Sequence, residues 1–117
     1  MTRLEFENAV HDAMEILPGW VHDALDNIVV QVRDAADEDL DPDGDDLLGL
    51  YVGTPLPDRG TDYAGELPDV IYMFYRPHVE LDLDGEDLRE EIAKTLIHEV
   101  AHYFGIEEER LHELGYG

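Results

Sequence analysis

The stretch that decides the fold is His98-Glu99-Val100-Ala101-His102, in which two histidines stand four residues apart. On a helix, residues at this spacing lie one above the other on one face, so both imidazoles can reach one metal ion. Zinc binds imidazole nitrogen at about 2.0–2.1 Å. Glu99 then lies beside an open coordination position, where a carboxylate suits the role of general base. The stretch predicts a site for one zinc ion, with His98 and His102 as ligands and Glu99 as the catalytic residue of a hydrolase.

The surrounding residues fit a helix that packs against a core. Apolar residues recur at helical spacing and would form a buried stripe: Ile92, Ala93, Leu96, Ile97, Val100 and Phe104. A polar strip would lie opposite, made of Thr95, His98, Glu99 and His102. The simpler alternative is an exposed helix face that carries two histidines and a glutamate by chance, because glutamate is abundant in this chain. The residues after His102 favour the metal site.

The helix is predicted to end at Gly105, because glycine readily adopts the left-handed conformation that ends many helices. The chain can then turn back toward the metal. Glu108, three residues later, is the preferred third ligand, which completes the pattern H-E-x-x-H-x-x-G-x-x-E. His112 ranks second because imidazole binds zinc well, although it is expected on the next helix. Glu109 ranks third, and Glu107 is a further alternative.

This pattern resembles that of the small bacterial zincin-like metallopeptidases, which are built around H-E-x-x-H-x-x-G-x-x-D. The resemblance is strongest over residues 91–114 and covers most of the chain through a similar order of elements. It implies a minimal zincin-like fold in one domain over residues 1–117. It also implies that His98, His102 and Glu108 bind the metal and that Glu99 is the catalytic carboxylate. Glu108 stands where the family usually has aspartate, yet the longer side chain can still bind zinc through oxygen at about 2.0–2.2 Å.

The charge of the chain restricts its partners. Thirty acidic residues oppose seven basic ones, which gives a formal net charge of −23 in 117 residues. Such a chain should repel phosphate backbones and anionic lipids, so we expect no nucleic-acid partner and no membrane partner. A peptide or protein substrate, in particular a cationic one, would be attracted. General solubility is the simpler explanation of the same charge.

Missing residue types exclude further classes of chemistry. The chain contains neither cysteine nor serine, so it has no disulfides and no serine or cysteine nucleophile, and nitrogen and oxygen must bind any zinc. The first seven residues include acids and no long apolar run, which argues against a signal peptide. No segment approaches the roughly 20 apolar residues needed to span a bilayer. We therefore expect a cytoplasmic protein.

Hydrophobic periodicity predicts an α+β fold. Helices are expected at residues 4–17, 86–104 and 107–114, with a short helix or turn at 20–25, and strands at residues 27–32, 47–52 and 70–75. This order favours a small sheet of three to four strands packed against helices, with the active-site helix near the C-terminus. Asp87 and Glu90 are a candidate capping pair for the helix at 86–104.

The resemblance also implies an edge strand beside the cleft. The strand near Tyr72–Tyr75 is one candidate to pair with an extended peptide, because an exposed edge offers unpaired backbone groups. The alternative is that this strand lies in the core.

The oxyanion of the reaction needs a further stabilising group, for which Tyr103, His78 and Tyr116 are candidates. His78 is otherwise interpreted as a surface histidine.

The two aspartate-rich stretches are interpreted as solvated acidic turns. Asp39–Gly44 matches only the first half of a calcium-binding loop, and its twelfth position is Leu50 instead of the required glutamate.

Two functions stay open for the chain: a zinc-dependent peptidase, or a non-enzymatic zinc-binding or protein-interaction domain that keeps the site for stability. The intact Glu99 favours the peptidase, because a structural zinc site normally fills all four positions and has no use for a base.

Overall fold

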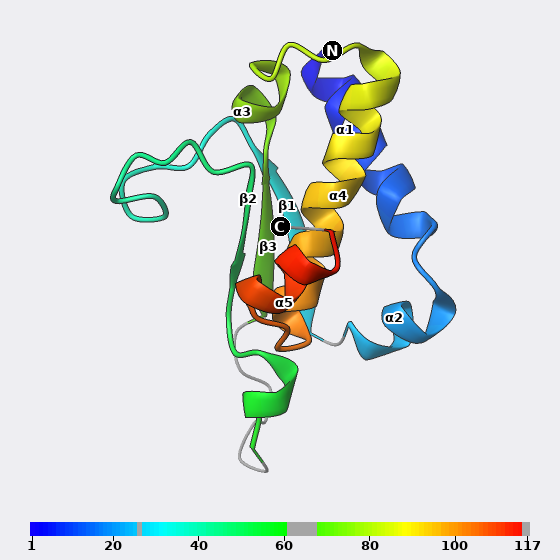
Figure 1. The fold of residues 1–117 in the computed structure, drawn as a ribbon, viewed down its shortest axis with the longest axis vertical. Helices are drawn as coiled ribbons and strands as arrows, with labels where there is room; N and C mark the ends of the chain where they lie inside the picture. The colour runs from blue at the N-terminus through cyan, green and yellow to red at the C-terminus, as the bar shows by residue number, and fades with distance from the viewer. Residues whose placement is uncertain (26, 61–67, 116–117) are drawn as a thin grey trace.

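A computed structural model of the chain describes residues 1–25, 27–60 and 68–115. Its elements are α1 (Arg3–Glu15), α2 (Gly19–Ala24), β1 (Ile28–Arg33), β2 (Gly49–Val52), the 3-10 helix η1 (Leu56–Asp58), β3 (Asp69–Phe74), α3 (Tyr75–Val79), α4 (Gly85–Tyr103) and α5 (Glu108–Glu113). Helices α1 and α4 lie on the same side of the sheet, and α5 turns back beside α4 (Figure 1). The predicted α+β class is confirmed.

The sheet has three strands in the order β1-β3-β2. Strand β1 runs parallel to β3, with Val30 opposite Ile71, and β2 runs antiparallel to β3, with Tyr51 opposite Ile71. Of the two alternatives for the strand near Tyr72–Tyr75, the edge strand is wrong and the core strand is correct: β3 is the central strand, and Tyr75 already belongs to α3. The error has a physical cause, since sequence order does not fix the spatial order of strands. The strand at the edge next to α4 is β2.

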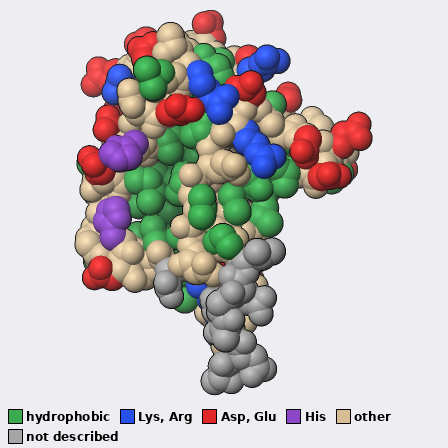
Figure 2. Space-filling view, turned by 180° about the vertical axis from the view of Figure 1, so that it is seen from behind, with side chains coloured by type: hydrophobic (Ala, Val, Ile, Leu, Met, Phe, Trp, Pro, Cys, Tyr) green, Lys and Arg blue, Asp and Glu red, His purple; other side chains and the backbone are tan. Residues whose placement is uncertain are grey.

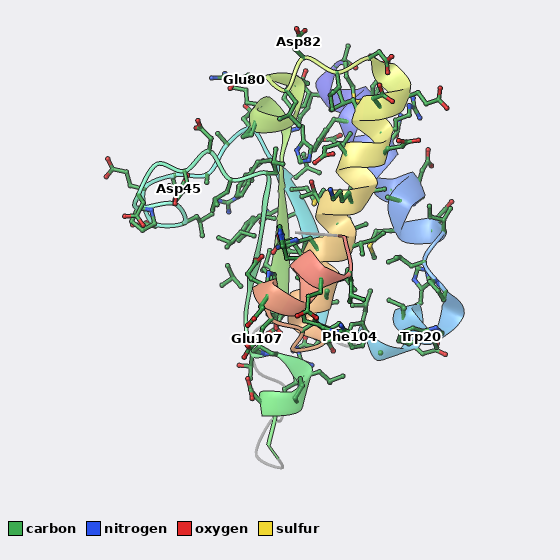
Figure 3. The ribbon with its side chains drawn as sticks, in the orientation of Figure 1. Trp20, Asp45, Glu80, Asp82, Phe104 and Glu107 are labelled. Carbon is green, nitrogen blue, oxygen red and sulfur yellow. The ribbon has the colours of Figure 1, made fainter. Side chains whose placement is uncertain are left out.

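The core lies between the sheet and the two long helices. Apolar side chains with no exposed surface come from α1, β3 and α4, and among them are Phe6, Ile71, Met73, Ile92 and Leu96. Helix α1 begins with the capping box that its sequence encodes, because Thr2 accepts a hydrogen bond from the Glu5 amide and the Glu5 carboxylate accepts one from the Thr2 amide. Farther along, Trp20 of α2 packs on Phe104 at the end of α4, with ring centroids 5.8 Å apart (Figure 3).

Two local predictions differ from the structure. Helix α4 is capped by Asp84, which accepts from the Asp87 amide at 2.9 Å, so the proposed pair of Asp87 and Glu90 is wrong. Helix α3 is not among the predicted elements, because Arg76-Pro77 directly follows the strand predicted at residues 70–75 and is interpreted as the close of that strand. Pro77 lies in the first turn of α3, where the amide hydrogen that proline lacks would have no partner inside the helix.

Among the described residues, all the acidic side chains except the buried Asp69 and Glu99 have part or all of their surface exposed. Figure 2 shows acidic side chains around the rim of one face and gathered on the loop between β1 and β2, which projects from the body of the protein. Hydrophobic side chains occupy the centre of that face. Among the described residues, no helix combines the length and the apolar character that crossing a membrane requires.

Candidate metal centre

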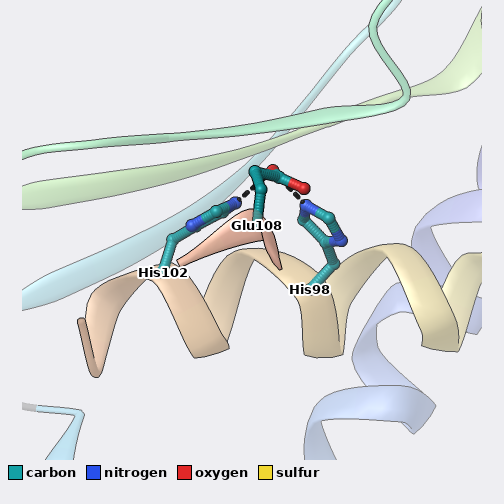
Figure 4. Close-up of side chains that lie close together, drawn as sticks. All are labelled: His98, His102 and Glu108. Carbon is teal, nitrogen blue, oxygen red and sulfur yellow. Dashed lines mark hydrogen bonds and ion pairs between the residues drawn. The ribbon is translucent and has the colours of Figure 1, made fainter. Parts of the chain in front are cut away.

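Three side chains converge at the C-terminal end of α4 and the start of α5. Glu108 Oε1 lies 2.8 Å from His98 Nε2 and 2.8 Å from His102 Nε2 (Figure 4). The two imidazole rings stand one helical turn apart, with centroids separated by 4.8 Å. The histidine side chains are 19% and 25% exposed, so solvent reaches the group. The structure thus brings together the three residues that the sequence pattern nominates.

The turn after α4 returns the chain to this group. Gly105 adopts φ +83°, the left-handed conformation expected from the sequence. Its amide donates to the His102 carbonyl at 2.9 Å, and the Ile106 amide donates to the Ala101 carbonyl at 3.0 Å. These two bonds form a Schellman ending, which stops the helix sharply. Helix α5 then begins at Glu108, and its buried Leu111 anchors it against the body of the protein.

A Gly105→Ala variant tests this turn. A Cβ at Gly105 would lie 2.7 Å from Pro57 Cγ and would occupy a left-handed conformation. We expect a loss of unfolding free energy of about 1–3 kcal/mol, measured by chemical denaturation, together with weaker metal binding because Glu108 is displaced. Gly115→Ala is the matched control, since Gly115 has φ +88° with no atom within 4 Å of the added Cβ. Equal losses in both variants would rule out a specific role for the Pro57 contact.

Glu99 lies beside the ligands but faces the sheet. Its residue is 7% exposed, and its Oε1 accepts a hydrogen bond from the Tyr51 amide at 3.0 Å. Strand β2 comes this close because Gly49 has no side chain: a Cβ there would lie 2.8 Å from Thr95 Cγ2 and 3.3 Å from Glu99 Cγ. Burial raises the pKa of Glu99, although His98, His102 and the Tyr51 amide oppose the shift.

The alternative third ligands lie elsewhere. Within the described part of the chain, the potential metal-binding group at this site contains Glu108 and neither Glu109 nor His112. Both of these side chains are exposed on α5, and Glu107 is the residue that precedes this helix. Partial burial would raise the pKa of Glu108, but hydrogen bonds from His98 and His102 outweigh it and lower the pKa.

Two open cavities meet at the group formed by His98, His102 and Glu108. One, of about 470 Å³, is bounded by His102, Glu108 and the segment of β2 that leads to Pro55. The other, of about 320 Å³, extends from His98 and Glu99 toward Glu91 and the acidic residues that precede β2. Together they form a groove between α4 and the free edge of β2. The resemblance implies a cleft beside an edge strand, but the sequence does not identify β2 as that strand, because this depends on the spatial order of the strands.

The two candidate oxyanion residues that the structure describes, Tyr103 and His78, do not reach the groove. Tyr103 is fully buried, and its hydroxyl donates to the Ala24 carbonyl at 2.7 Å. His78 is also fully buried, so its interpretation as a cleft or surface residue is wrong. The error over His78 has the same origin as that over Pro77, because the helix that carries His78 inward is not predicted. Tyr116 lies outside the described residues.

Because His78 is buried, we predict that the unfolding free energy of the protein depends on pH. Its Nδ1 donates to the Phe74 carbonyl at 2.6 Å, and its Nε2 lies 2.9 Å from the Thr95 hydroxyl. Burial lowers the pKa of His78 below its usual value, so the unfolded chain takes up this proton first as the pH falls. The neutral, buried His78 therefore contributes its full stabilisation of the folded state above about pH 6.5. As the pH falls from there toward the pKa of His78 in the folded state, the unfolding free energy decreases by up to about 1.4 kcal/mol per pH unit.

The measurement is the unfolding free energy between about pH 5 and about pH 7.5, compared with a His78→Asn variant. Asparagine keeps a donor near the position of Nδ1 and does not titrate, so all other titrating groups cancel in the difference between the two proteins. We expect the difference to change below about pH 6.5. Parallel curves for the two proteins would refute a neutral, buried His78.

Comparisons with known proteins agree with this geometry. The family model described as zincin-like metallopeptidase matches residues 25–117, which include the residues that converge at the site. No curated protein matches the chain significantly. Among solved structures, a conserved hypothetical protein from Thermus thermophilus is similar, with 24% sequence identity, a TM-score of 0.65 and coverage of 89% of this chain and 94% of the other; this likeness shows a shared fold. Because the family model spans most of the sequence, the chain belongs to the zincin-like metallopeptidase family.

Proposed function

We propose that this protein is a zinc-dependent peptidase in which His98, His102 and Glu108 bind one zinc ion and Glu99 is the general base. The observation that carries the proposal is the contact of Glu108 Oε1 with both histidine Nε2 atoms, at 2.8 Å each, directly beside a buried carboxylate in an open groove. Membership of the zincin-like metallopeptidase family supports zinc binding and hydrolysis.

The donor atoms fit zinc. Two imidazole nitrogens and one carboxylate oxygen are the ligand types of catalytic zinc sites, which leave one position open. Donors around a tetrahedral ion at about 2.0–2.1 Å lie about 3.3 Å apart. The distances of 2.8 Å between the nitrogen and oxygen atoms therefore need to increase only slightly. The partly exposed histidines and exposed Glu108 carboxylate can make such a movement without disturbing the core.

In the proposed mechanism, Glu99 moves a proton. A bound zinc ion supplies Lewis acidity, because it polarises a carbonyl and makes water more acidic. The Tyr51 amide holds Oε1 of Glu99, which leaves Oε2 to take a proton from the attacking water. The carboxylic acid then gives this proton to the departing amine as the carbon–nitrogen bond breaks. Water thus contributes its hydroxyl to the new carboxylate product and its proton to the amine.

Strand β2 offers a place for an extended peptide. The Phe74 amide donates to the Leu48 carbonyl, so the alternation of an antiparallel ladder turns the backbone groups of Gly49 and Tyr51 to the free edge. The Tyr51 amide already donates to Glu99, and the other backbone groups of Gly49 and Tyr51 on this edge are the ones that a substrate backbone would pair with. A peptide added along this edge would cross the metal centre. Cationic peptides are favoured by the net charge of −23.

A non-enzymatic zinc-binding domain is the second candidate. The observation that favours it is the placement of Glu108 on α5 and of both histidines on α4, because a bound ion would fasten the short α5 to the body of the protein. In that case the ion would contribute to stability alone. The two candidates agree on zinc and disagree on turnover.

The test uses the purified protein, a randomised peptide mixture analysed by mass spectrometry, and metal analysis. We expect about one zinc per chain and peptide cleavage that a chelator abolishes and added zinc restores. His102→Ala should lose both the zinc and the cleavage. If the protein binds zinc but leaves all peptides intact, and chelation only lowers its thermal stability, the zinc-binding domain is the correct assignment. Failure to bind zinc overturns both candidates.

A further inference from the structure

We infer that the buried ion pair of Arg59 and Asp69 acts through Tyr51 to position Glu99. Arg59, Asp69 and Tyr51 are then positioning residues for hydrolysis, and this inference rests on the function proposed above. No sequence motif points to them. They belong to the end of the sheet at which β2 finishes and β3 begins, and η1 lies at the same end (Figure 1).

The ion pair is withdrawn from solvent. Arg59 Nη2 lies 2.6 Å from Asp69 Oδ2, and the two side chains are only 7% and 5% exposed. Arg59 Nε also donates to the Thr54 carbonyl at 3.0 Å, and the guanidinium lies 4.9 Å from the centroid of the Tyr103 ring. The pair therefore ties the chain that leaves β2 to the first residue of β3 and to the buried face of α4.

Tyr51 connects this pair to the general base. Its hydroxyl donates to the same Oδ2 atom of Asp69 at 2.5 Å, while its amide donates to Glu99 Oε1 at 3.0 Å. Burial and the hydrogen bond to Asp69 raise the pKa of Tyr51, so the hydroxyl stays protonated and remains a donor. Tyr51 thus contacts both the ion pair and the general base. Its ring also makes an edge-on contact with the ring of Tyr103, with centroids 6.0 Å apart.

Strand β2 needs such an anchor. It has four residues and pairs with β3 on one side only, so its position along α4 is weakly fixed by the ladder itself. The Tyr51 amide orients the Glu99 carboxylate only while the strand keeps its place. Because catalysis is sensitive to misplacement of about 1 Å, loosening this amide should slow the proton transfer more than it weakens substrate or zinc binding.

Tyr51→Phe is the informative variant, since it removes the hydroxyl and keeps the ring, the backbone amide and the ion pair. Tyr75→Phe is the control: its hydroxyl makes a bond of the same length, 2.5 Å, but to the backbone carbonyl of Met1, away from the metal centre. Both variants lose one partly buried hydrogen bond. The bond of Tyr51 ends on a carboxylate and is the stronger of the two, so the unfolding free energy of both variants is measured beside their activity. A difference in kcat between the two variants, measured where both are fully folded, reports on the connection to Glu99.

Two measurements decide the question: kcat and KM for a cleaved peptide with zinc bound, and the hydrogen-exchange rate of the residue 51 amide in the metal-free protein. For Tyr51→Phe we expect kcat to fall about tenfold with KM and zinc affinity unchanged, and the amide to exchange faster. Tyr75→Phe should match the wild type in both. Unchanged kcat and unchanged exchange in Tyr51→Phe would overturn the inference.

The two proposals can fail separately. If the wild-type protein cleaves no peptide, the proposed function fails, and the exchange rate of the residue 51 amide still tests whether the network holds β2 against Glu99. If the wild type is active but Tyr51→Phe and Tyr75→Phe lose activity equally, the network is only structural and the inference fails alone.

Discussion

A Glu99→Gln variant will lose peptide hydrolysis, with kcat lower by about 10²–10⁴-fold, and will still bind zinc. Glutamine has almost the same shape as glutamate, and its amide oxygen can still accept the hydrogen bond that the Tyr51 amide now gives to Oε1. The side chain therefore keeps its place in the core but can no longer take a proton. The measurement is kcat on a peptide that the wild type cleaves, together with the zinc content of both proteins.

Glu109→Gln is the control for this experiment. Glu109 is exposed on α5 next to the site, and it is not part of the potential metal-binding group. The substitution removes the same charge from the same region, so it should leave turnover close to that of the wild type. A Glu99→Gln protein that cleaves peptides as fast as the wild type would remove Glu99 from the mechanism, whatever the zinc content.

Local features of the centre could be predicted from the sequence because they depend on the geometry of one helix and its end. The spacing of His98 and His102 places both rings on one helical face. Gly105 is recognisable because few other residues tolerate its positive φ. The sequence ranks Glu108 ahead of its neighbours, but its contact with both histidines depends on the direction in which α5 leaves the turn, which the burial of Leu111 sets.

The features that the sequence did not reveal all depend on contacts between distant segments. Strand β2 lies at the edge because β3 pairs on both of its sides, which no local pattern encodes. The hydrogen bond from Tyr51 to Glu99 joins residues 48 positions apart. His78 carries no sign of burial in its neighbours, and only α3 turns it toward Thr95. Hydrophobic periodicity gives the elements of this fold, whereas long-range polar contacts place the general base.

Loss of the Glu108 carboxylate will have the largest effect on metal binding among substitutions on α5. Glu108→Ala leaves two imidazoles as ligands, so we expect zinc affinity to fall by more than the roughly 10–100-fold that is typical when an outer-shell partner of a metal ligand is lost. His112→Ala should bind zinc as the wild type does, because His112 is exposed and lies outside the group formed by His98, His102 and Glu108. Competition with a chromophoric chelator measures both affinities.

A Glu108→Asp variant keeps the carboxylate but shortens the side chain, so it tests whether metal binding depends on the length of this side chain. Aspartate is the residue usual in the family pattern but is one methylene shorter, and Glu108 now places Oε1 2.8 Å from both histidine nitrogens. Zinc affinity between those of the wild type and Glu108→Ala would mean that the backbone of α5 is set for the longer side chain. If His112→Ala loses zinc while Glu108→Ala retains it, the imidazole on α5 is the third ligand, and α5 must turn to bring it to the metal.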